Sequence, residues 1–354
     1  MKFFFRKNNY FKFFILILSL AFILGSAYFA PKIYRNIKEK MKGDFVFGTP
    51  NTEQNLADGI VVVITVDDGY CHQALVTLTS LLMSAKKTTF YKINVFVPRE
   101  FGDESKKKLL TLEKTYSENC TIEFISMEDC FTNSYISAHF TNVVYYRLRA
   151  PSVLNKRSRC IYMDTDIIVE EDLSELFEID LQGRLLGGVL DSASGYRNEK
   201  EKMERESYQK AFNIKTLDHY INSGVLLWDL DACRAAKVED RFRDFLKKYK
   251  NPSQHDQTTI NASLSTEEIL LLDFRFNTQA YMFSEAPYGQ DKDRFSLIFD
   301  EKQWKTAWER PCIIHFAGEK PWKDPSTYWI EKWWNVARIT PFAEDIIKQF
   351  RTTK

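Results

Sequence analysis

The alternation of buried strands with amphipathic helices decides what this chain can fold into. The run Gly59-Ile-Val-Val-Val-Ile-Thr-Val66 is apolar on both faces, as in a strand buried inside a parallel sheet. Apolar residues then recur at helical spacing over residues 71–85. Further strands are expected at 91–97, 121–126, 159–163, 185–190, 224–228 and 312–316, and further helices at 103–116, 145–154 and 231–248. This order predicts an α/β protein with a mostly parallel, twisted sheet flanked by helices.

Charge balance and missing motifs narrow the possible functions. Lys plus Arg number 49 against 48 acidic residues in the 354-residue chain, so it lacks the excess positive charge that binding to bulk nucleic acid requires. The six cysteines include no CxxC pair, which argues against a zinc ribbon or a thioredoxin-like redox site. The patterns GxxxxGK(S/T), GxGxxG, HExxH and GxSxG are absent. The sequence therefore gives no support to a P-loop NTPase, a usual dinucleotide-binding fold, a zinc protease or an α/β-hydrolase.

The first 42 residues differ in character from the rest of the chain. Four basic residues, at positions 2, 6, 7 and 12, precede an apolar run over residues 13–30. A helix of that length would span about 27 Å, which is close to the hydrocarbon thickness of a bilayer. We interpret the run as an uncleaved transmembrane anchor rather than as a cleaved signal peptide ending near Gly25-Ser26-Ala27, or as a buried core helix. A basic stalk completes residues 1–42, and the composition of residues 43–57 is typical of a linker.

A pair of carboxylates follows the expected strand at 159–163. In Asp164-Thr165-Asp166, side chains at i and i+2 share one face of an extended chain, so both carboxylates could converge on one cation. Hard oxygen ligands suit Mg²⁺ or Mn²⁺. The same spacing recurs in Asp229-Leu-Asp231 and Asp291-Lys-Asp293, which we interpret as a helix N-cap and a solvated loop. From its context alone, the 164–166 segment is open to two interpretations, a structural turn or a metal site.

Five further polar clusters stand at the ends of the expected elements, and each has an ordinary structural explanation by itself. They are T-V-D-D-G-Y (65–70), Y-Y-R-L (145–148), N-S-G-V (222–225), H-D-Q (255–257) and H-F-A-G-E-K-P-W (315–322). Together with Y-M-D-T-D (162–166), and in this order, they make the sequence resemble the glycosyltransferase family 8 enzymes. That family includes bacterial lipopolysaccharide galactosyl- and glucosyltransferases and glycogenin. The resemblance spans residues 58–325.

The resemblance implies a GT-A fold, which is a Rossmann-like α/β fold, and an enzyme that uses Mn²⁺, with Mg²⁺ as a possible substitute. Such an enzyme moves a hexose, galactose or glucose, from a UDP-sugar to a glycan or glycolipid acceptor with retention at the anomeric carbon, here in the synthesis of lipopolysaccharide or another surface glycan. The implied metal ligands are Asp164, Asp166 and His315. The implied donor-binding residues are Thr65, Asp67, Tyr70, Arg147, Asp164, Thr165, Gly318 and Lys320. The implied catalytic residues, which face the reacting sugar, are Asn222, Asp256 and Gln257.

The sequence departs from the family pattern in two places, and two other functions stay open. Position 69 is Gly where Asn is common, and one residue rather than two separates Gly318 from Lys320. The alternatives are a metal-dependent nucleotide-sugar hydrolase or nucleotidyltransferase, and a sugar-nucleotide-binding protein without catalysis. A simple hydrolase would not require Asn222 and the 255–257 cluster in that order, and a non-catalytic protein need not keep chemically competent residues at every metal and donor position.

The expected domain order is a membrane anchor with a basic stalk (1–42), a linker (43–57), a GT-A glycosyltransferase domain (58–325) and an aromatic helical segment (326–354). Tyr328-Trp329 and Trp333-Trp334 in the last segment fit core packing better than a membrane-binding surface. Segment 191–220, rich in Lys, Glu and Arg, is expected on the acceptor side. We predict a single-pass membrane protein whose catalytic domain faces the cytoplasm at a bacterial inner membrane, or the Golgi lumen in a eukaryote.

Overall fold

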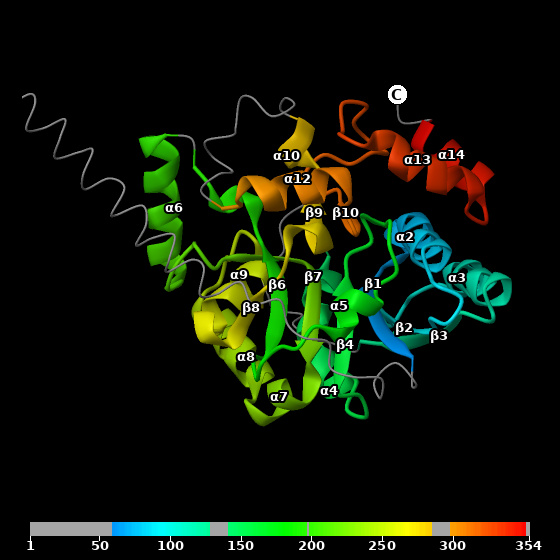
Figure 1. Ribbon diagram of the computed structural model, residues 1–354. Helices are drawn as coiled ribbons and strands as arrows, with labels where there is room; N and C mark the ends of the chain where they lie inside the picture. Colours follow the sequence, from blue (N-terminus) through cyan, green and yellow to red (C-terminus); the bar gives the residue numbers. More distant parts are fainter. Residues whose placement is uncertain (1–58, 128–140, 197, 285–297, 352–354) are drawn as a thin grey trace, which may run out of the picture. The chain divides into compact units, whose positions relative to one another are not determined.

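The computed structural model describes residues 59–127, 141–196, 198–284 and 298–351, all within Gly48–Lys354, one of the two units into which the chain divides (Figure 1). The strands are β1 (Ile60–Thr65), β2 (Tyr91–Val97), β3 (Cys120–Ser126), β4 (Arg159–Met163), β5 (Ile167–Val169), β6 (Leu186–Leu190), β7 (Ile221–Asp229), β8 (Ile269–Leu271), β9 (Thr278–Gln279) and β10 (Ile313–His315). The α-helices are α2 (Cys71–Met83), α3 (Asp103–Thr115), α4 (Ala150–Val153), α5 (Ser174–Glu178), α6 (Glu199–Phe212), α7 (Leu230–Ala235), α8 (Val238–Lys248), α9 (His255–Ser263), α10 (Tyr281–Ser284), α12 (Glu301–Glu309), α13 (Ile330–Ile339) and α14 (Ala343–Arg351). The 3₁₀-helices are η1 (Asp68–Tyr70), η2 (Asn142–Arg149), η3 (Ser192–Ser194), η4 (Thr266–Glu268) and η5 (Phe274–Asn277).

The main sheet has seven strands in the order β3-β2-β1-β4-β7-β6-β8. Four of its pairings are parallel, namely β1–β2, β2–β3, β1–β4 and β6–β8. Strand β7 runs antiparallel to both of its neighbours, β4 and β6. The expected α/β fold with a mostly parallel sheet is therefore confirmed, with β7 as the reversed strand. Because β7 is reversed, it begins, rather than ends, beside the end of β4.

Strand β1 lies in the middle of the parallel part of the sheet. All six of its residues are buried, as its β-branched composition predicts for a strand covered on both faces. A second, three-stranded sheet has the order β5-β10-β9, and the sequence pattern did not predict it. Its strand β5 begins one residue after Asp166 and pairs with β10 so that His315 lies opposite Ile167. This small sheet places the end of β10 beside the residues that follow β4.

Two expected helices take a different form. Residues 145–154 form the 3₁₀-helix η2 and then the four-residue α4, which has Pro151 in its first turn, instead of one α-helix. The helix expected at 231–248 is interrupted at Lys237, whose φ of 52° is left-handed, and this separates α7 from α8. The predicted N-cap before α7 is confirmed, since the side chain of Asp229 accepts a hydrogen bond from the backbone N–H of Ala232. The predicted loop at 291–293 lies outside the described residues.

The C-terminal aromatic residues pack into the protein. Trp333 of α13 is fully buried, and its ring centroid lies 5.1 Å from that of Trp322. The cluster around it includes Ile168 of β5 together with Ile314 and Phe316 at β10. Figure 1 shows α13 and α14, at the orange-red end of the colour bar, next to α2. The core-packing interpretation of this segment is therefore confirmed for Trp333.

The predicted single-pass membrane localisation requires correction. Across the residues that the structure describes, every helix is too short or too polar to cross a bilayer. The apolar run at 13–30, on which the prediction of an anchor rested, lies outside those residues. We therefore withdraw the single-pass localisation, and with it the predicted association with a membrane through an N-terminal helix.

Candidate active site

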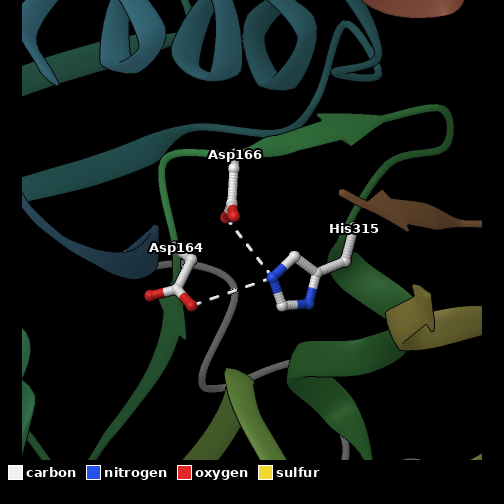
Figure 2. Close-up of side chains that lie close together, drawn as sticks. All are labelled: Asp164, Asp166 and His315. Carbon is white, nitrogen blue, oxygen red and sulfur yellow. Dashed lines mark ion pairs between the residues drawn. The ribbon is translucent and has the colours of Figure 1, made fainter. Parts of the chain in front are cut away.

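Three predicted metal ligands converge at the junction of the two sheets. Asp164 and Asp166 stand in the turn between β4 and β5, and His315 is the last residue of β10 (Figure 2). The backbone fixes this turn from both sides. The N–H of Asp164 donates to the carbonyl of Gly224 on β7 at 2.8 Å, and the N–H of Phe316 donates to the carbonyl of Asp166 at 2.9 Å.

The side chains of the trio point at one another. Figure 2 shows one imidazole nitrogen facing both carboxylates, and this atom, His315 Nε2, lies 3.3 Å from Asp166 Oδ1 and 3.8 Å from Asp164 Oδ2. The candidate ligand atoms all lie within 4.8 Å of one another. Asp166 Oδ1 is buried and accepts no hydrogen bond from the described residues. A buried carboxylate oxygen without a donor, beside a second carboxylate and an imidazole, fits a divalent cation such as Mn²⁺ or Mg²⁺.

The second oxygen of each carboxylate has a cationic partner. Lys320 Nζ donates to Asp166 Oδ2 at 2.5 Å and to the carbonyl of Phe316 at 2.7 Å. Arg147 Nη2 lies 2.8 Å from Asp164 Oδ1, which also accepts from the hydroxyl of Tyr162 at 2.7 Å. Each aspartate is therefore oriented by a cation on one side, and its other oxygen is turned toward His315.

These contacts set the charge state of the buried groups. Burial raises the pKa of Asp166, but opposing contacts, of which the Lys320 ammonium is the largest, outweigh it, so the pKa lies well below its usual range. Burial lowers the pKa of Lys320, but the Asp166 carboxylate more than compensates, and the net shift is upward. Arg147 behaves in the same way, since burial lowers its pKa while Asp164 and Asp256 raise it above its usual value. All three groups are thus charged at neutral pH.

Arg147 joins the metal-ligand trio to Asp256. Its Nε lies 3.2 Å from Asp256 Oδ2, its Nη1 donates to the carbonyl of Ser223 at 2.8 Å, and its guanidinium lies 4.3 Å from the ring centroid of Tyr162. Burial raises the pKa of Asp256, which Arg147 opposes, and the result is a value of about 6. The resemblance implies a direct donor contact for Arg147, whereas in this structure its guanidinium is occupied by protein groups.

Asn222 and Gln257 lie together and share a partner that the sequence analysis missed. Both side-chain amides donate to Asp191 Oδ2, at 3.1 Å and 3.0 Å, and Gln257 Oε1 accepts from the N–H of Ser223 at 3.1 Å. A signal for Asp191 was present, because it directly follows the expected strand at 185–190 just as Asp164 follows the strand at 159–163. The ends of the strands thus contribute more polar groups than the motifs alone indicate.

A second missed residue, Asn277, lies behind His315. Asn277 is fully buried at the end of η5, its Oδ1 is 2.9 Å from His315 Nδ1, and its Nδ2 donates to Asn222 Oδ1 at 2.9 Å. No pattern in the sequence marks this position. Gly224 is also essential to the geometry, because a Cβ there would lie 2.2 Å from Cε1 of His315.

The remaining predicted donor-binding residues border this cluster. The Thr65 hydroxyl is 3.0 Å from that of Tyr162, which links the end of β1 to Asp164. Asp67 caps η1 by accepting from the N–H of Tyr70 at 3.2 Å, and its other oxygen accepts from the hydroxyl of Thr141 at 3.0 Å. Burial raises the pKa of the Tyr70 phenol above its usual value; the charge of Lys320 opposes this shift, and the carboxylates of Asp166 and Asp164 add to it.

Thr165 and Gly318 have mainly conformational features here. Thr165 is buried, and its carbonyl accepts from the hydroxyl of Thr77 on α2 at 2.9 Å. Gly318 has a φ of 94°, a region that favours glycine, and a Cβ there would meet the ring of Tyr281 at 3.7 Å. Thr165 thus shapes the turn that carries Asp166, and Gly318 shapes the turn that precedes Lys320.

Comparison with known proteins shows to which family the chain belongs and which solved structures share its fold. The sequence model of Glycosyl transferase family 8 matches residues 61–326. General stress protein A of Bacillus subtilis is 27% identical over 268 residues, covering 74% of this chain and 86% of the relative. Lipopolysaccharide 1,2-glucosyltransferase of Escherichia coli is 24% identical over 316 residues, covering 87% of this chain and 85% of the relative.

Solved structures show a similar arrangement of elements. The galactosyltransferase LgtC, solved in complex with donor and acceptor sugar analogs, superposes with a TM-score of 0.64 at 20% identity. The superposition covers 82% of this chain and 100% of that chain. At this level of identity the likeness shows the fold, which is α/β and GT-A-like.

Proposed function

The chain belongs to glycosyltransferase family 8, and on that premise we propose that it transfers a galactose or glucose from a UDP-sugar to a glycan or glycolipid acceptor with retention at the anomeric carbon. The single observation that carries the proposal is the trio of Asp164, Asp166 and His315, in which a buried oxygen of Asp166 has no hydrogen-bond donor among the described residues. A lipopolysaccharide glucosyltransferase among the relatives supports a role in the synthesis of a surface glycan.

The proposed metal site would stabilise the negative charge of the leaving group. A divalent cation held by the trio, Mn²⁺ in our proposal and Mg²⁺ as its substitute, would supply positive charge to the departing diphosphate. Lys320, 2.5 Å from Asp166, is near enough to add a second positive charge on the same side. Gly318 permits the turn that precedes Lys320.

The other predicted residues divide between the two ends of the donor. We assign the uridine to Thr65, Asp67 and Tyr70, which stand at the end of β1 or shortly after it, near the trio. Asn222, Asp256 and Gln257 would face the reacting sugar, held in place by Asp191 and Arg147. Thr165 would contribute through the turn that carries both aspartates.

For retention, we propose a displacement on one face of the sugar. The bond between the anomeric carbon and the diphosphate oxygen breaks, the bond to the acceptor oxygen forms on the same face, and the acceptor proton passes to a diphosphate oxygen. Two observations favour this route over a covalent intermediate. The Asp256 carboxylate is paired with Arg147 at 3.2 Å, and the Gln257 side chain is committed to Asp191 and Ser223, so neither is a free nucleophile.

A donor screen tests the proposal. The purified protein is incubated with a panel of nucleotide sugars, Mn²⁺ and candidate glycan acceptors, and both UDP release and the anomeric configuration of the product are measured. We expect release from UDP-galactose or UDP-glucose, dependence on acceptor, and an α-linked product from the α-linked donor. Free sugar in amounts equal to UDP, with or without acceptor, would instead identify a nucleotide-sugar hydrolase. A β-linked product would refute retention.

A further inference from the structure

A continuous chain of hydrogen bonds runs behind the carboxylates from His315 to Gln257. His315 Nδ1 lies 2.9 Å from Asn277 Oδ1, Asn277 Nδ2 lies 2.9 Å from Asn222 Oδ1, and Asn222 Nδ2 lies 3.1 Å from Asp191 Oδ2. Gln257 Nε2 reaches the same Asp191 oxygen at 3.0 Å. All five side chains belong to buried residues, and Asn277 is fully buried. This chain of hydrogen bonds therefore connects a proposed metal ligand to the residues proposed to face the sugar through buried side chains.

A backbone group fixes which atoms donate and which accept in this series of hydrogen bonds. The N–H of Gly224, which can only donate, lies 2.9 Å from Asn222 Oδ1, so this atom of the amide is the oxygen. Asn277 must then present its NH₂ to that oxygen, which turns its own oxygen toward His315. The Asn277 oxygen can only accept, so the proton of the neutral His315 ring is on Nδ1.

The tautomer has a consequence at the carboxylates. With the proton on Nδ1, Nε2 carries a lone pair and lies 3.3 Å from Asp166 Oδ1, the buried oxygen that accepts no hydrogen bond. Two atoms that both offer lone pairs thus face each other, which is the electronic arrangement that ligation of a cation requires. The other tautomer would instead place a proton between them.

We propose that Asn277 is a positioning residue with two functions: it holds His315 in the tautomer that leaves Nε2 free as a ligand, and it orients the amide of Asn222. The consequence for metal binding rests on the proposed function, whereas the tautomer is a property of the chain alone. The two functions use opposite ends of one side chain, so substitutions can separate them. Asn277→Asp keeps an acceptor for Nδ1–H but removes the donor to Asn222, and Asn277→Ala removes both.

The tautomer is measured directly on the full-length, metal-free protein. Long-range ¹H–¹⁵N spectra of ¹⁵N-histidine-labelled protein are recorded at about pH 8, where an ordinary imidazole is neutral. The His315 signals are assigned by their loss in His315→Gln. We expect the Nδ1–H tautomer in the wild type and in Asn277→Asp, and a mixture that includes Nε2–H in Asn277→Ala. A wild-type spectrum with the proton on Nε2 would overturn the proposal.

Affinity for Mn²⁺, measured by isothermal titration calorimetry, provides the second readout. Removal of such an outer partner typically weakens metal binding about 10–100-fold. We expect that loss in Asn277→Ala and near-normal affinity in Asn277→Asp, which should nevertheless turn over more slowly because Asn222 has lost its donor. The matched control is Asn94→Ala. Asn94 is a buried asparagine of β2, and within the described residues its side-chain amide donates to two backbone carbonyls, Lys92 O at 3.0 Å and Val62 O at 3.5 Å.

The outcomes separate the proposal from the proposed function. Equal loss of Mn²⁺ affinity in Asn94→Ala and Asn277→Ala would reduce Asn277 to a general packing role and overturn the proposal. An unchanged His315 tautomer in Asn277→Ala would do the same. A wild-type protein with the Nδ1–H tautomer but no measurable affinity for Mn²⁺ would support the tautomer assignment and refute the metal site on which the proposed function depends.

Discussion

Asp166 has a different partner on each carboxylate oxygen, so we expect it to be the residue of the trio that tolerates substitution least. Oδ2 is held by Lys320 at 2.5 Å, whereas Oδ1 accepts no hydrogen bond from any residue that the structure describes and faces His315. We expect Asp166→Ala to reduce kcat about a thousandfold, because the loss of ~4 kcal/mol of charge stabilisation on the leaving diphosphate corresponds to that factor. The measurement is steady-state release of UDP at saturating donor and Mn²⁺.

The control for Asp166→Ala is an aspartate of similar sequence context outside the site. Asp231 belongs to the same Asp-x-Asp spacing but forms an exposed ion pair with Arg234 in α7. Asp231→Ala should leave turnover within about twofold, because exposed pairs of this kind contribute little. Comparable losses in the two variants, or full activity of the wild type in EDTA, would rule out the proposed metal site.

Gly224 is required by the position of the His315 ring. A Cβ at this position would lie 2.2 Å from Cε1 and 2.7 Å from Nδ1 of His315, so Gly224→Ala must displace the imidazole. We expect at least a tenfold loss of Mn²⁺ affinity, because the ring no longer points at the aspartates. Calorimetric titration is compared with Gly102→Ala, where the new Cβ would meet the carboxylate of the exposed Asp68, at 3.2 Å. Unchanged affinity in Gly224→Ala would contradict this geometry.

Among the elements, those with a clear periodic signal could be predicted, and those that depend on distant partners could not. The apolar runs that form β1, β2 and β4 were identified because a strand that is buried on both faces has apolar residues at nearly every position. The three-residue strand β5 is too short for such a pattern, and it exists because it pairs with β10. The strand expected at 312–316 is present as β10, but its pairing with β5 could not be predicted. The reversed direction of β7 is likewise a property of its neighbours.

The same distinction applies to the residues of the site. The aspartates and His315 were identified by motif, and the structure brings all three together. Asn277 could not be identified, since its importance depends on contacts with His315 and with Asn222, which is 55 positions away along the chain. A sequence therefore indicates which chemical groups are available, and the fold decides which of them meet.

An ion pair between elements should control stability in acid. Arg241 of α8 donates to both carboxylate oxygens of Glu268 in η4, at 2.8 Å and 2.7 Å, and these hydrogen bonds lower the pKa of Glu268 to about 2. A lowered pKa means that the pair stabilises the fold above the unfolded-state pKa, near 4.3, and that this contribution is lost as pH falls toward 2. Because both side chains are about one-third exposed, we expect a contribution of only about 1 kcal/mol.

Glu268→Gln tests this contribution. The variant should unfold at lower urea concentration than the wild type at pH 7, and the two should converge as pH falls from about 4.5 to 2, the window in which the wild type loses the pair. Glu309→Gln on α12 is the control, because the ion pair that Glu309 forms with Lys305 is exposed. A difference between Glu268→Gln and the wild type that stays constant across this window would refute the assignment.

At the scale of the whole described unit, the C-terminal helices share their core with the strands that carry the site. Trp333 is fully buried in a cluster with Ile168, Ile314 and Phe316, which lie within three residues of the metal-ligand trio. We expect Trp333→Ala to lower the free energy of unfolding by about 3–5 kcal/mol. Urea denaturation is compared with Trp308→Ala, in which a 42% exposed side chain is removed. Similar midpoints for the two variants would show that α13 is not part of this core.

The reversed strand β7 has a consequence for how such an enzyme can diversify. Segment 191–220 leaves the sheet after β6 and returns at β7, and its two ends are joined by a backbone hydrogen bond of 2.8 Å from Asp191 to Tyr220. Between them stands α6, which has no buried residue. The excursion thus opens and closes at the site, while the exposed positions of α6 are free to vary. Under the proposed function, this excursion is an exchangeable module, in which substitutions would change the acceptor while the proposed donor-binding residues stay in place.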